Sequence, residues 1–540
     1  MTGGRKRLGV TMLVLALLGA ACGGDDGDDS AGETGGGGAT ADTIVIGTTD
    51  SLQNSFDPAQ AYDYFASEVI QNTAETLVSY EPNAVEPSPR LAARMPDVSP
   101  DGLEYTFELR PGMKFHDGTA VNSQAVKFSL LRAKEFGAVD PEAAGVLLAG
   151  IKAIATPSPT TVKILLDRPN VTFLSRLAYS VASIVSVAAY RDHVLQAADT
   201  PGPAVASRYK TDTVVGTGPY KLVSYKEKES LDFEANPDYW GDAPKTKRIR
   251  VRLFDRSSAL KLALQNKEVD IAFRTLQPDE NAAFKDRPGF KLVEGEGPGI
   301  RYITFNVQSE PWNKVDMRRA LAAAVDRDAV VAEVFKGTAK ALLSMVPPTF
   351  PTHEPKWEEL YPSSAVEKHL AAAGVPAGEK VKVDFWYSPT HYGDTEAAVA
   401  EIIARSLEAT GRFDVEVSNV EWADYGKKRA AGEMPVFLMG WYPDYLDADD
   451  YLEPFANPKI FDPAKWEDPR MLELVAAEQA ELDPARRAAA IKAAQAYMAE
   501  QAPYVPVFQI SQFAATTEAI SGVVLDPIQI FRYWLLEKRA

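Results

Sequence analysis

The body of the chain alternates short apolar segments with longer amphipathic ones. Residues 104–109 (EYTFEL) alternate polar and apolar side chains, which is the period of a half-buried strand. Residues 395–408 form an amphipathic segment without breakers, which predicts a helix. Further strands are predicted at 43–48, 161–166, 220–225, 249–254, 302–307, 381–386, 415–420, 436–439 and 504–510. Further helices are predicted at 317–335, 423–430 and 470–501. The last of these is broken at Asp483-Pro484, where Asp483 can cap the second half. This order predicts the α/β class.

Two segments rich in glycine or proline interrupt this alternation. They are residues 295–299 (GEGPG) and 501–506 (QAPYVP). If both are crossovers, the chain leaves a first lobe once and returns to it once. A two-lobed body with a cleft between the lobes would follow.

The first residues differ from the body. A basic trio at 5–7 precedes an apolar run at 8–18, and the only cysteine, Cys22, follows small residues. Residues 1–22 are therefore predicted to be a secretory signal, too short to span a membrane. The end of the segment resembles a bacterial lipobox, although Gly19 stands where leucine is usual. The resemblance implies acylation of Cys22, and the alternative is an ordinary signal peptide with an incidental cysteine.

Residues 23–42 contain many glycines and acidic side chains and no aromatic residue. Such a composition cannot bury a core, so this segment is predicted to be a flexible tether. If Cys22 is acylated, the tether would join the folded body to a bilayer.

Composition and motifs exclude several functions. The 540-residue chain has 57 Lys and Arg against 75 Asp and Glu, a formal charge of −18, which disfavours nucleic-acid binding. One cysteine gives no disulfide and no cysteine metal site. The five histidines are scattered, and no HExxH, GxSxG, Walker or GxGxxG motif is present. We therefore expect no catalytic activity, no cofactor and no metal. His116 in KFHDG could suggest a metal ligand, but a structural role in a turn is the preferred interpretation.

Residues 440–455 (GWYPDYLDADDYLEPF) are the most distinctive segment. Aromatic side chains stand beside several aspartates directly after the predicted strand at 436–439. Aromatic rings and a carboxylate can hold an organic cation or an amine. The alternative is an acidic surface loop whose aromatic residues anchor it to the core.

Several segments, in collinear order, resemble the family 5 solute-binding proteins of ABC importers, which include dipeptide-, oligopeptide- and nickel-binding proteins. They are 55–59 (SFDPA), 75–78 (ETLV), 100–128 (PDGLEYTFELRPGMKFHDGTAVNSQAVKF), 215–220 (VGTGPY), 236–240 (NPDYW), 263–270 (ALQNKEVD), 305–306 (FN), 318–321 with 326–327, and 440–441 with 444–445. The resemblance runs from about residue 43 to the C-terminus.

This resemblance implies a two-lobed periplasmic-binding-protein architecture (type II, large cluster C) with an extra subdomain in the first lobe. The implied limits are 43–298 for lobe I, with the subdomain at about 80–210, then 299–503 for lobe II and 504–540 for the return to lobe I.

The same resemblance implies an extracytoplasmic, lipid-anchored, monomeric protein. It would capture di- or oligopeptides between its lobes and deliver them to a membrane permease driven by ATPases. Asp444 matches the position whose carboxylate receives the peptide's α-ammonium. The other implied ligand-binding residues are Gly440, Trp441, Tyr442, Tyr445, Gln53 and Asn54. Arg301 is a candidate for the ligand's carboxylate, with a structural ion pair as the alternative.

Other functions stay open at this point. A transporter subunit could instead bind a nickel chelate, an opine or an oligosaccharide. A surface hydrolase, such as a peptidase or esterase, could use the same cleft, although no nucleophile–base motif supports it. An adhesion or chaperone lipoprotein with a vestigial cleft is a third possibility.

Overall fold

The computed structural model describes residues 42–53, 55–140, 143–192, 212–389, 391–461, 463–525, 527–528 and 530–539. The predicted signal, Cys22 and nearly all of the predicted tether lie outside these residues, and so does Asn54. Within the described ranges, none of the helices combines the length and the apolar character needed to cross a bilayer.

One large mixed sheet organises the described chain. Among the described residues it has 11 strands in the order β15-β14-β16-β12-β17-β11-β1-β10-β9-β8, with β13 added to β17. The strands are β1 (Thr43–Thr48), β8 (Tyr220–Lys226), β9 (Ser230–Ala235), β10 (Arg248–Leu253), β11 (Ile271–Phe273), β12 (Phe290–Phe305), β13 (Ala339–Ala341), β14 (Val381–Tyr387), β15 (Phe413–Asn419), β16 (Val436–Trp441) and β17 (Tyr504–Thr517). The predicted α/β class is confirmed.

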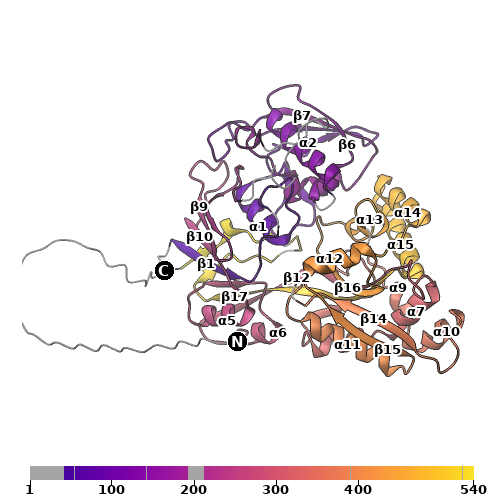
Figure 1. Cartoon of the computed structure of the whole chain (residues 1–540). Helices are drawn as coiled ribbons and strands as arrows, with labels where there is room; N and C mark the ends of the chain where they lie inside the picture. The colour runs from indigo at the N-terminus through magenta and orange to yellow at the C-terminus, as the bar shows by residue number, and fades with distance from the viewer. Residues whose placement is uncertain are drawn as a thin grey trace, which may run out of the picture. The chain divides into compact units, whose positions relative to one another are not determined.

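Strands β12 and β17 join the two halves of this sheet (Figure 1). They pair antiparallel from Phe290 with Thr517 to Thr304 with Tyr504, and the register shifts between Glu296 and Ile300. Residues 295–299, predicted as a crossover between the lobes, lie inside β12. Their glycines serve close packing, because a Cβ on Gly297 would come within 2.4 Å of the Ile510 carbonyl oxygen. The lobe limits at 298 and 503 stay a prediction, since β12 continues across residue 298 and β17 begins directly after residue 503.

The first lobe is the part of the fold whose core includes Ile44, Phe65, Phe233 and Tyr533. Its helices are α1 (Tyr64–Thr73), α5 (Ser257–Gln265) and α6 (Pro278–Ala282), and its short strands are β18 (Ile520–Ser521) and β19 (Glu537–Lys538). An inserted subdomain has a core of its own, which includes Phe107, Leu130 and Ile164. It contains β2 (Val78–Tyr80), β3 (Pro87–Pro89), β4 (Asp97–Val98), β5 (Glu104–Glu108), β6 (Ile151–Ala155), β7 (Thr161–Leu166), α2 (Ser123–Val139), α3 (Phe173–Leu177) and α4 (Val187–Tyr190).

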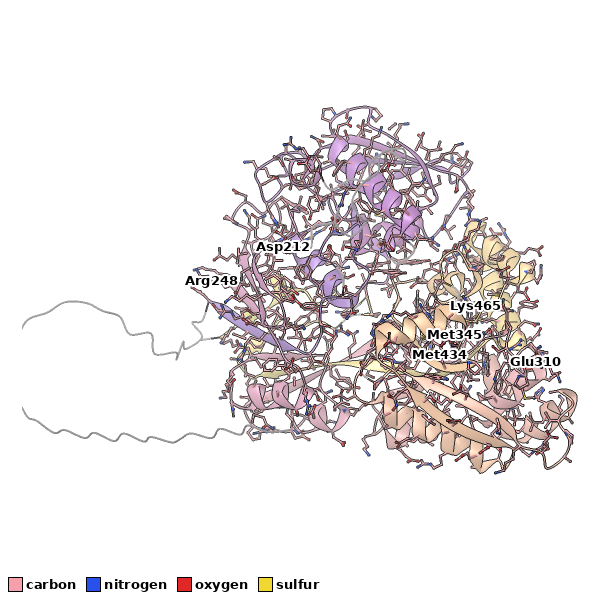
Figure 2. The ribbon with its side chains drawn as sticks, in the orientation of Figure 1. Asp212, Arg248, Glu310, Met345, Met434 and Lys465 are labelled. Carbon is pink, nitrogen blue, oxygen red and sulfur yellow. The ribbon has the colours of Figure 1, made fainter. Side chains whose placement is uncertain are left out.

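The second lobe packs helices around β14, β15 and β16 (Figure 1). The helices are α7 (Val315–Ala324), α8 (Arg327–Glu333), α9 (Lys356–Leu360), α10 (Val366–Ala372), α11 (Glu396–Ala409), α12 (Trp422–Ala431), α13 (Glu453–Ala456), α14 (Pro469–Ala480) and α15 (Pro484–Gln501). Met345 and Met434 are buried in its core, whereas Arg248 projects from the first lobe (Figure 2).

Two expectations about helices have different outcomes. The single helix predicted at 317–335 is wrong, because the chain forms α7 and α8 with a break at Val325, and the Asp326 side chain caps α8 by accepting from the Ala329 amide. The break at Asp483-Pro484 is confirmed, since Asp483 caps α15 through the Arg486 amide.

Candidate functional site

The end of β16 places an acidic and aromatic segment between the lobes. The strand is buried, pairing parallel with β14 and antiparallel with β12, where Arg301 lies opposite Gly440. A Cβ on Gly440 would lie 2.3 Å from the Arg301 guanidinium, so a larger residue would displace this arginine. After Trp441 the chain leaves the sheet and reaches the 3-10 helix η5 (Ala448–Tyr451). The segment between them carries Tyr442, Asp444 and Tyr445.

Asp444 contacts the first lobe. It is 4% exposed, and the Tyr62 hydroxyl donates to its Oδ2 at 2.8 Å. The rings of Tyr64 and Tyr442 are 5.8 Å apart, so that the lobes also meet there. We call this contact between residues 62–64 and 442–444 the interlobe seam.

The Asp444 carboxylate interacts with the charge of Arg176, but Arg176 forms its ion pairs with Asp449 and Glu453. None of the ion pairs among the described residues includes Asp444. Burial raises the pKa of Asp444 to about 7, although hydrogen bonds from Tyr62 and Tyr179 act in the opposite direction. The Asp444 amide donates to Asp450 Oδ2 at 2.7 Å, and burial together with the Asp444 charge raises the Asp450 pKa. A positively charged group at Asp444 would therefore be favoured.

Asp449, in η5, has a different environment. Arg176 of α3 donates to Asp449 Oδ2 at 2.9 Å and also binds Glu453. Tyr445 donates to the same Oδ2 at 2.8 Å, and Gln479 donates to Oδ1 at 2.9 Å. Burial opposes its charge, but Arg176 and the hydrogen bonds from Gln479 and Tyr445 act together against burial, and the pKa of Asp449 is lowered. This carboxylate is fully partnered and joins the second lobe to the inserted subdomain.

Arg301 is enclosed within the second lobe. Its side chain is 2% exposed, and it donates to Glu396 at 3.2 Å, to the Ile300 carbonyl at 3.2 Å and to the Tyr392 carbonyl at 3.4 Å. The Tyr442 hydroxyl accepts a further bond at 3.4 Å. These contacts are those of the structural ion pair named as the alternative. Its role toward a ligand stays a prediction.

The other predicted site residues divide between the seam and the cores. Trp441 packs its ring 5.3 Å from Phe455 in the second lobe, and Tyr445 is buried with the core of the inserted subdomain. Gln53 is exposed and donates to Ser51 at 3.3 Å. Asn54 lies outside the described residues, so the predicted first-lobe edge is not tested.

Sequence reasoning missed the first-lobe partners of Asp444. Tyr62 and Tyr64 flank Asp63, whose carboxylate caps α1 by accepting from the Ala66 amide. The run Tyr62-Asp63-Tyr64-Phe65 was a visible signal, because aromatic residues cluster at the start of a capped helix. Tyr179 and Arg176 carry no such local signal.

The described residues do not favour a metal. No group of three potential ligands lies close enough to hold an ion within the part of the chain that the structure covers. His116 contacts the Gly218 carbonyl oxygen through Nε2 at 3.0 Å, and burial lowers its pKa to about 4. Gly112 and Gly118 have φ values of 77° and 82°, in the turns on either side of it. His116 thus has the contacts of a structural residue.

Comparisons with known proteins address the family directly. Residues 86–462, more than half of the chain, match the family described as bacterial extracellular solute-binding proteins, family 5. The chain is 27% identical over 475 residues to the dipeptide-binding protein of Escherichia coli, covering 84% of this chain and 86% of that one. It is 27% identical over 553 residues to heme-binding protein A of Haemophilus influenzae, covering 96% of each.

A solved structure agrees with the fold. The periplasmic binding protein DppA of Helicobacter pylori, solved with the peptide STSA, superposes with a TM-score of 0.79 at 23% identity. The match covers 92% of this chain and 98% of that one, which confirms the predicted binding-protein architecture. The chain belongs to family 5 of the bacterial extracellular solute-binding proteins.

Proposed function

We propose that this protein is the extracytoplasmic binding subunit of an ABC importer and captures di- or oligopeptides at the interlobe seam. The observation that carries the proposal is the buried Asp444 carboxylate, whose hydrogen bonds to the described residues of the first lobe come from tyrosine hydroxyl groups and not from a cation. A peptide α-ammonium would supply the missing positive charge and replace a neutral hydrogen bond with a charge-assisted one. Relatives named as dipeptide-binding proteins support the same ligand class.

Transport requires that the lobes separate to admit a ligand. Strands β12 and β17 are the connections at which a hinge would act, since they pass between the two halves of the sheet. The ligand would enter with the lobes apart, and closure would exclude water from Asp444. A membrane permease with its ATPases would then receive the ligand. We propose no catalytic step, and absence of hydrolysis of a reporter peptide by the pure protein would test this.

The lipid anchor is part of the proposal. Acylation of Cys22 would keep the binding protein close to its permease on the outer face of the cytoplasmic membrane, and the predicted tether would let it move there. Cys22→Ser should release the protein into the soluble fraction, whereas retention of this variant in membranes would contradict the anchor.

A non-peptide ligand is the second candidate, because heme-binding protein A is as similar as the dipeptide-binding protein. Native mass spectrometry of the purified protein, followed by denaturation, separates the two. A mixture of short peptides that is reduced in Asp444→Asn would support the proposal. One non-peptide mass would refute the peptide ligand and leave the transport role. If the protein is purified empty, a thermal-shift screen with di- and tripeptides answers the same question.

A further inference from the structure

A second charged group, Arg274, lies beside the interlobe seam. Arg274 follows β11, whose neighbours in the sheet are β1 and β17. Its amide donates to the Phe513 carbonyl at 2.9 Å, and its φ is 46°, in the left-handed region. A residue with a side chain is uncommon in that conformation. The backbone directs this side chain from the end of a buried strand of the first lobe.

The Arg274 guanidinium is oriented but not fully hydrogen-bonded. It pairs with Asp50 at 2.9 Å and lies over the Tyr64 ring, 3.7 Å from the ring centre. Its Nε is buried and has no hydrogen-bond partner among the described residues. Burial works against its charge, yet Asp50, Tyr64 and further neighbours together outweigh burial, so the pKa of Arg274 is raised. A buried donor on a charged group is costly to leave unpaired, so an acceptor would be favoured here.

Arg274 and Arg301 differ in what they can still bind. Arg301 uses its three nitrogen atoms on Glu396, on two carbonyl groups and on Tyr442. Its side chain is 2% exposed, against 14% for Arg274. Of these two arginines near Tyr442, Arg274 is the one with a nitrogen, the buried Nε, that has no hydrogen-bond partner among the described residues, and its side chain as a whole is the more exposed.

The seam brings Arg274 and Asp444 to one short stretch of chain. Tyr62 bonds Asp444, and Tyr64 stacks on Arg274. The residue between them, Asp63, is extended, with φ −125° and ψ 158°. The Cα atoms of residues two apart are at most about 7 Å from each other. Across the seam, Tyr62 meets Asp444 and Tyr64 meets Tyr442, so the two contacts run side by side.

We propose that Arg274, held by Asp50 and Tyr64, is a carboxylate-recognising subsite of the interlobe seam. The inference rests on the proposed function, in which Asp444 takes the ligand's amine. The ligand would then carry both charges, with an amine at Asp444 and a carboxylate at Arg274. Two sources supply that carboxylate, the C-terminus of a short peptide and an acidic side chain.

The test is isothermal calorimetry with defined peptides on the full-length protein. The probes are Ala-Ala, Ala-Ala amide, N-acetyl-Ala-Ala, Ala-Glu amide and Ala-Gln amide. The proteins are wild type, Arg274→Gln, and Arg250→Gln as control, because Arg250 forms an exposed pair with Asp232 on the outer strands of the same lobe.

The wild type should bind the probe with a carboxylate at least about tenfold more tightly than its amide, the size expected for a hydrogen bond to a charged group. A preference for Ala-Ala over its amide identifies the C-terminus as the source. A preference for Ala-Glu amide over Ala-Gln amide identifies the side chain. Arg274→Gln should abolish whichever preference is found, and Arg250→Gln should keep it.

Two results would overturn the subsite. One is a wild type that shows neither preference, and the other is a preference that survives in Arg274→Gln. If Arg274→Gln does not fold, Arg274→Lys replaces it. This variant should weaken the preference for the carboxylate probe, because lysine keeps the charge and loses the planar guanidinium. An unchanged preference in Arg274→Lys overturns the subsite.

Binding that is lost on N-acetylation upholds the proposed function independently of the subsite. A wild type that binds none of these peptides overturns both.

Discussion

Asp444 and Asp449 are five residues apart in the chain, both are buried, and their surroundings are opposite. Asp449 has an arginine, a tyrosine and a glutamine as donors, and its pKa is lowered. Asp444 has hydroxyl donors, and its pKa is raised to about 7. The first carboxylate is paired within the protein, whereas the second is the one that we propose is paired by the ammonium group of a ligand.

The difference separates stability from binding within one loop. A buried ion pair that loses one partner leaves an uncompensated charge, which destabilises the fold. A buried carboxylate without a cation already has that cost in the unliganded protein, and a cationic ligand relieves it. Substitutions at the two positions should therefore change different measurements.

The largest expected effect is on stability, at Arg176. Arg176→Met leaves Asp449 and Glu453 buried without their cation, and the free energy of unfolding should fall by about 3–5 kcal/mol. Urea denaturation measures it. The control is Arg168→Met, since Arg168 is 58% exposed and reaches Glu453 only at 3.8 Å, so its loss should cost less than about 1 kcal/mol. Equal losses of unfolding free energy in Arg176→Met and Arg168→Met would contradict the stabilising role given to the ion pairs of Asp449 and Glu453.

The next effect is on binding, at Asp444. Asp444→Asn keeps an acceptor for Tyr62 and removes a buried charge, so the fold should be as stable as before or more stable. Affinity for an amine-bearing peptide should fall by about 2–5 kcal/mol. Calorimetry with Ala-Ala measures this fall, with the exposed Asp97→Asn as control. Unchanged affinity in Asp444→Asn would remove Asp444 from the site.

A third effect concerns pH. Because the pKa of Asp444 rises from 3.8 to about 7 on folding, the folded chain retains a proton that the unfolded chain releases between these values. This carboxyl therefore contributes stability that is present below about pH 4 and is lost as pH rises to about 7. Asp450 and Arg176 also interact with the Asp444 carboxyl group. The difference between wild type and Asp444→Asn in the pH dependence of stability therefore isolates the contribution of Asp444.

Ligand binding should follow the same proton. An ammonium at Asp444 favours the charged carboxylate, so at pH 6 binding should release up to about one proton, and affinity should rise with pH by up to about tenfold per unit. Calorimetry in two buffers with different ionisation enthalpies counts the released protons. If wild type and Asp444→Asn release equal numbers of protons on binding, the released proton does not come from Asp444.

The smallest effect is expected at Tyr62. Tyr62→Phe removes one hydroxyl donor from Asp444, which should raise the pKa of this carboxyl further and cost about 1 kcal/mol of stability. The matched control is Tyr497→Phe, which removes a tyrosine–aspartate hydrogen bond of 3.0 Å to Asp468, away from the seam. The midpoint of the pH dependence of stability should move in Tyr62→Phe and stay in place in Tyr497→Phe. Movement in both variants would show that the effect of Tyr62 does not pass through Asp444.

Local pattern predicted much of the fold. The strand at 161–166 has its predicted bounds, because polar and apolar residues alternate through it. The helix predicted at 317–335 failed where Asp326 offered a better cap than a continued helix. Residues 295–299 were predicted to be a crossover between the lobes; they lie inside β12, where Gly297 and Gly299 let the strand pass close to Ile510 of β17.

The site was predictable on one side only. Trp441, Tyr442 and Asp444 share one strand end, so their grouping was visible in the sequence. Tyr62, which contacts Asp444, and Arg176, which contacts Asp449, are hundreds of residues away in the chain. Their contacts depend on how the lobes meet, which no local spacing encodes.

The most direct test is a crystal structure of the protein with a bound dipeptide. We predict that the amine nitrogen of the ligand lies within about 3 Å of the Asp444 carboxylate, between the two lobes. A ligand bound elsewhere, with Asp444 still bonded to Tyr62 and no cation beside it, would contradict the account.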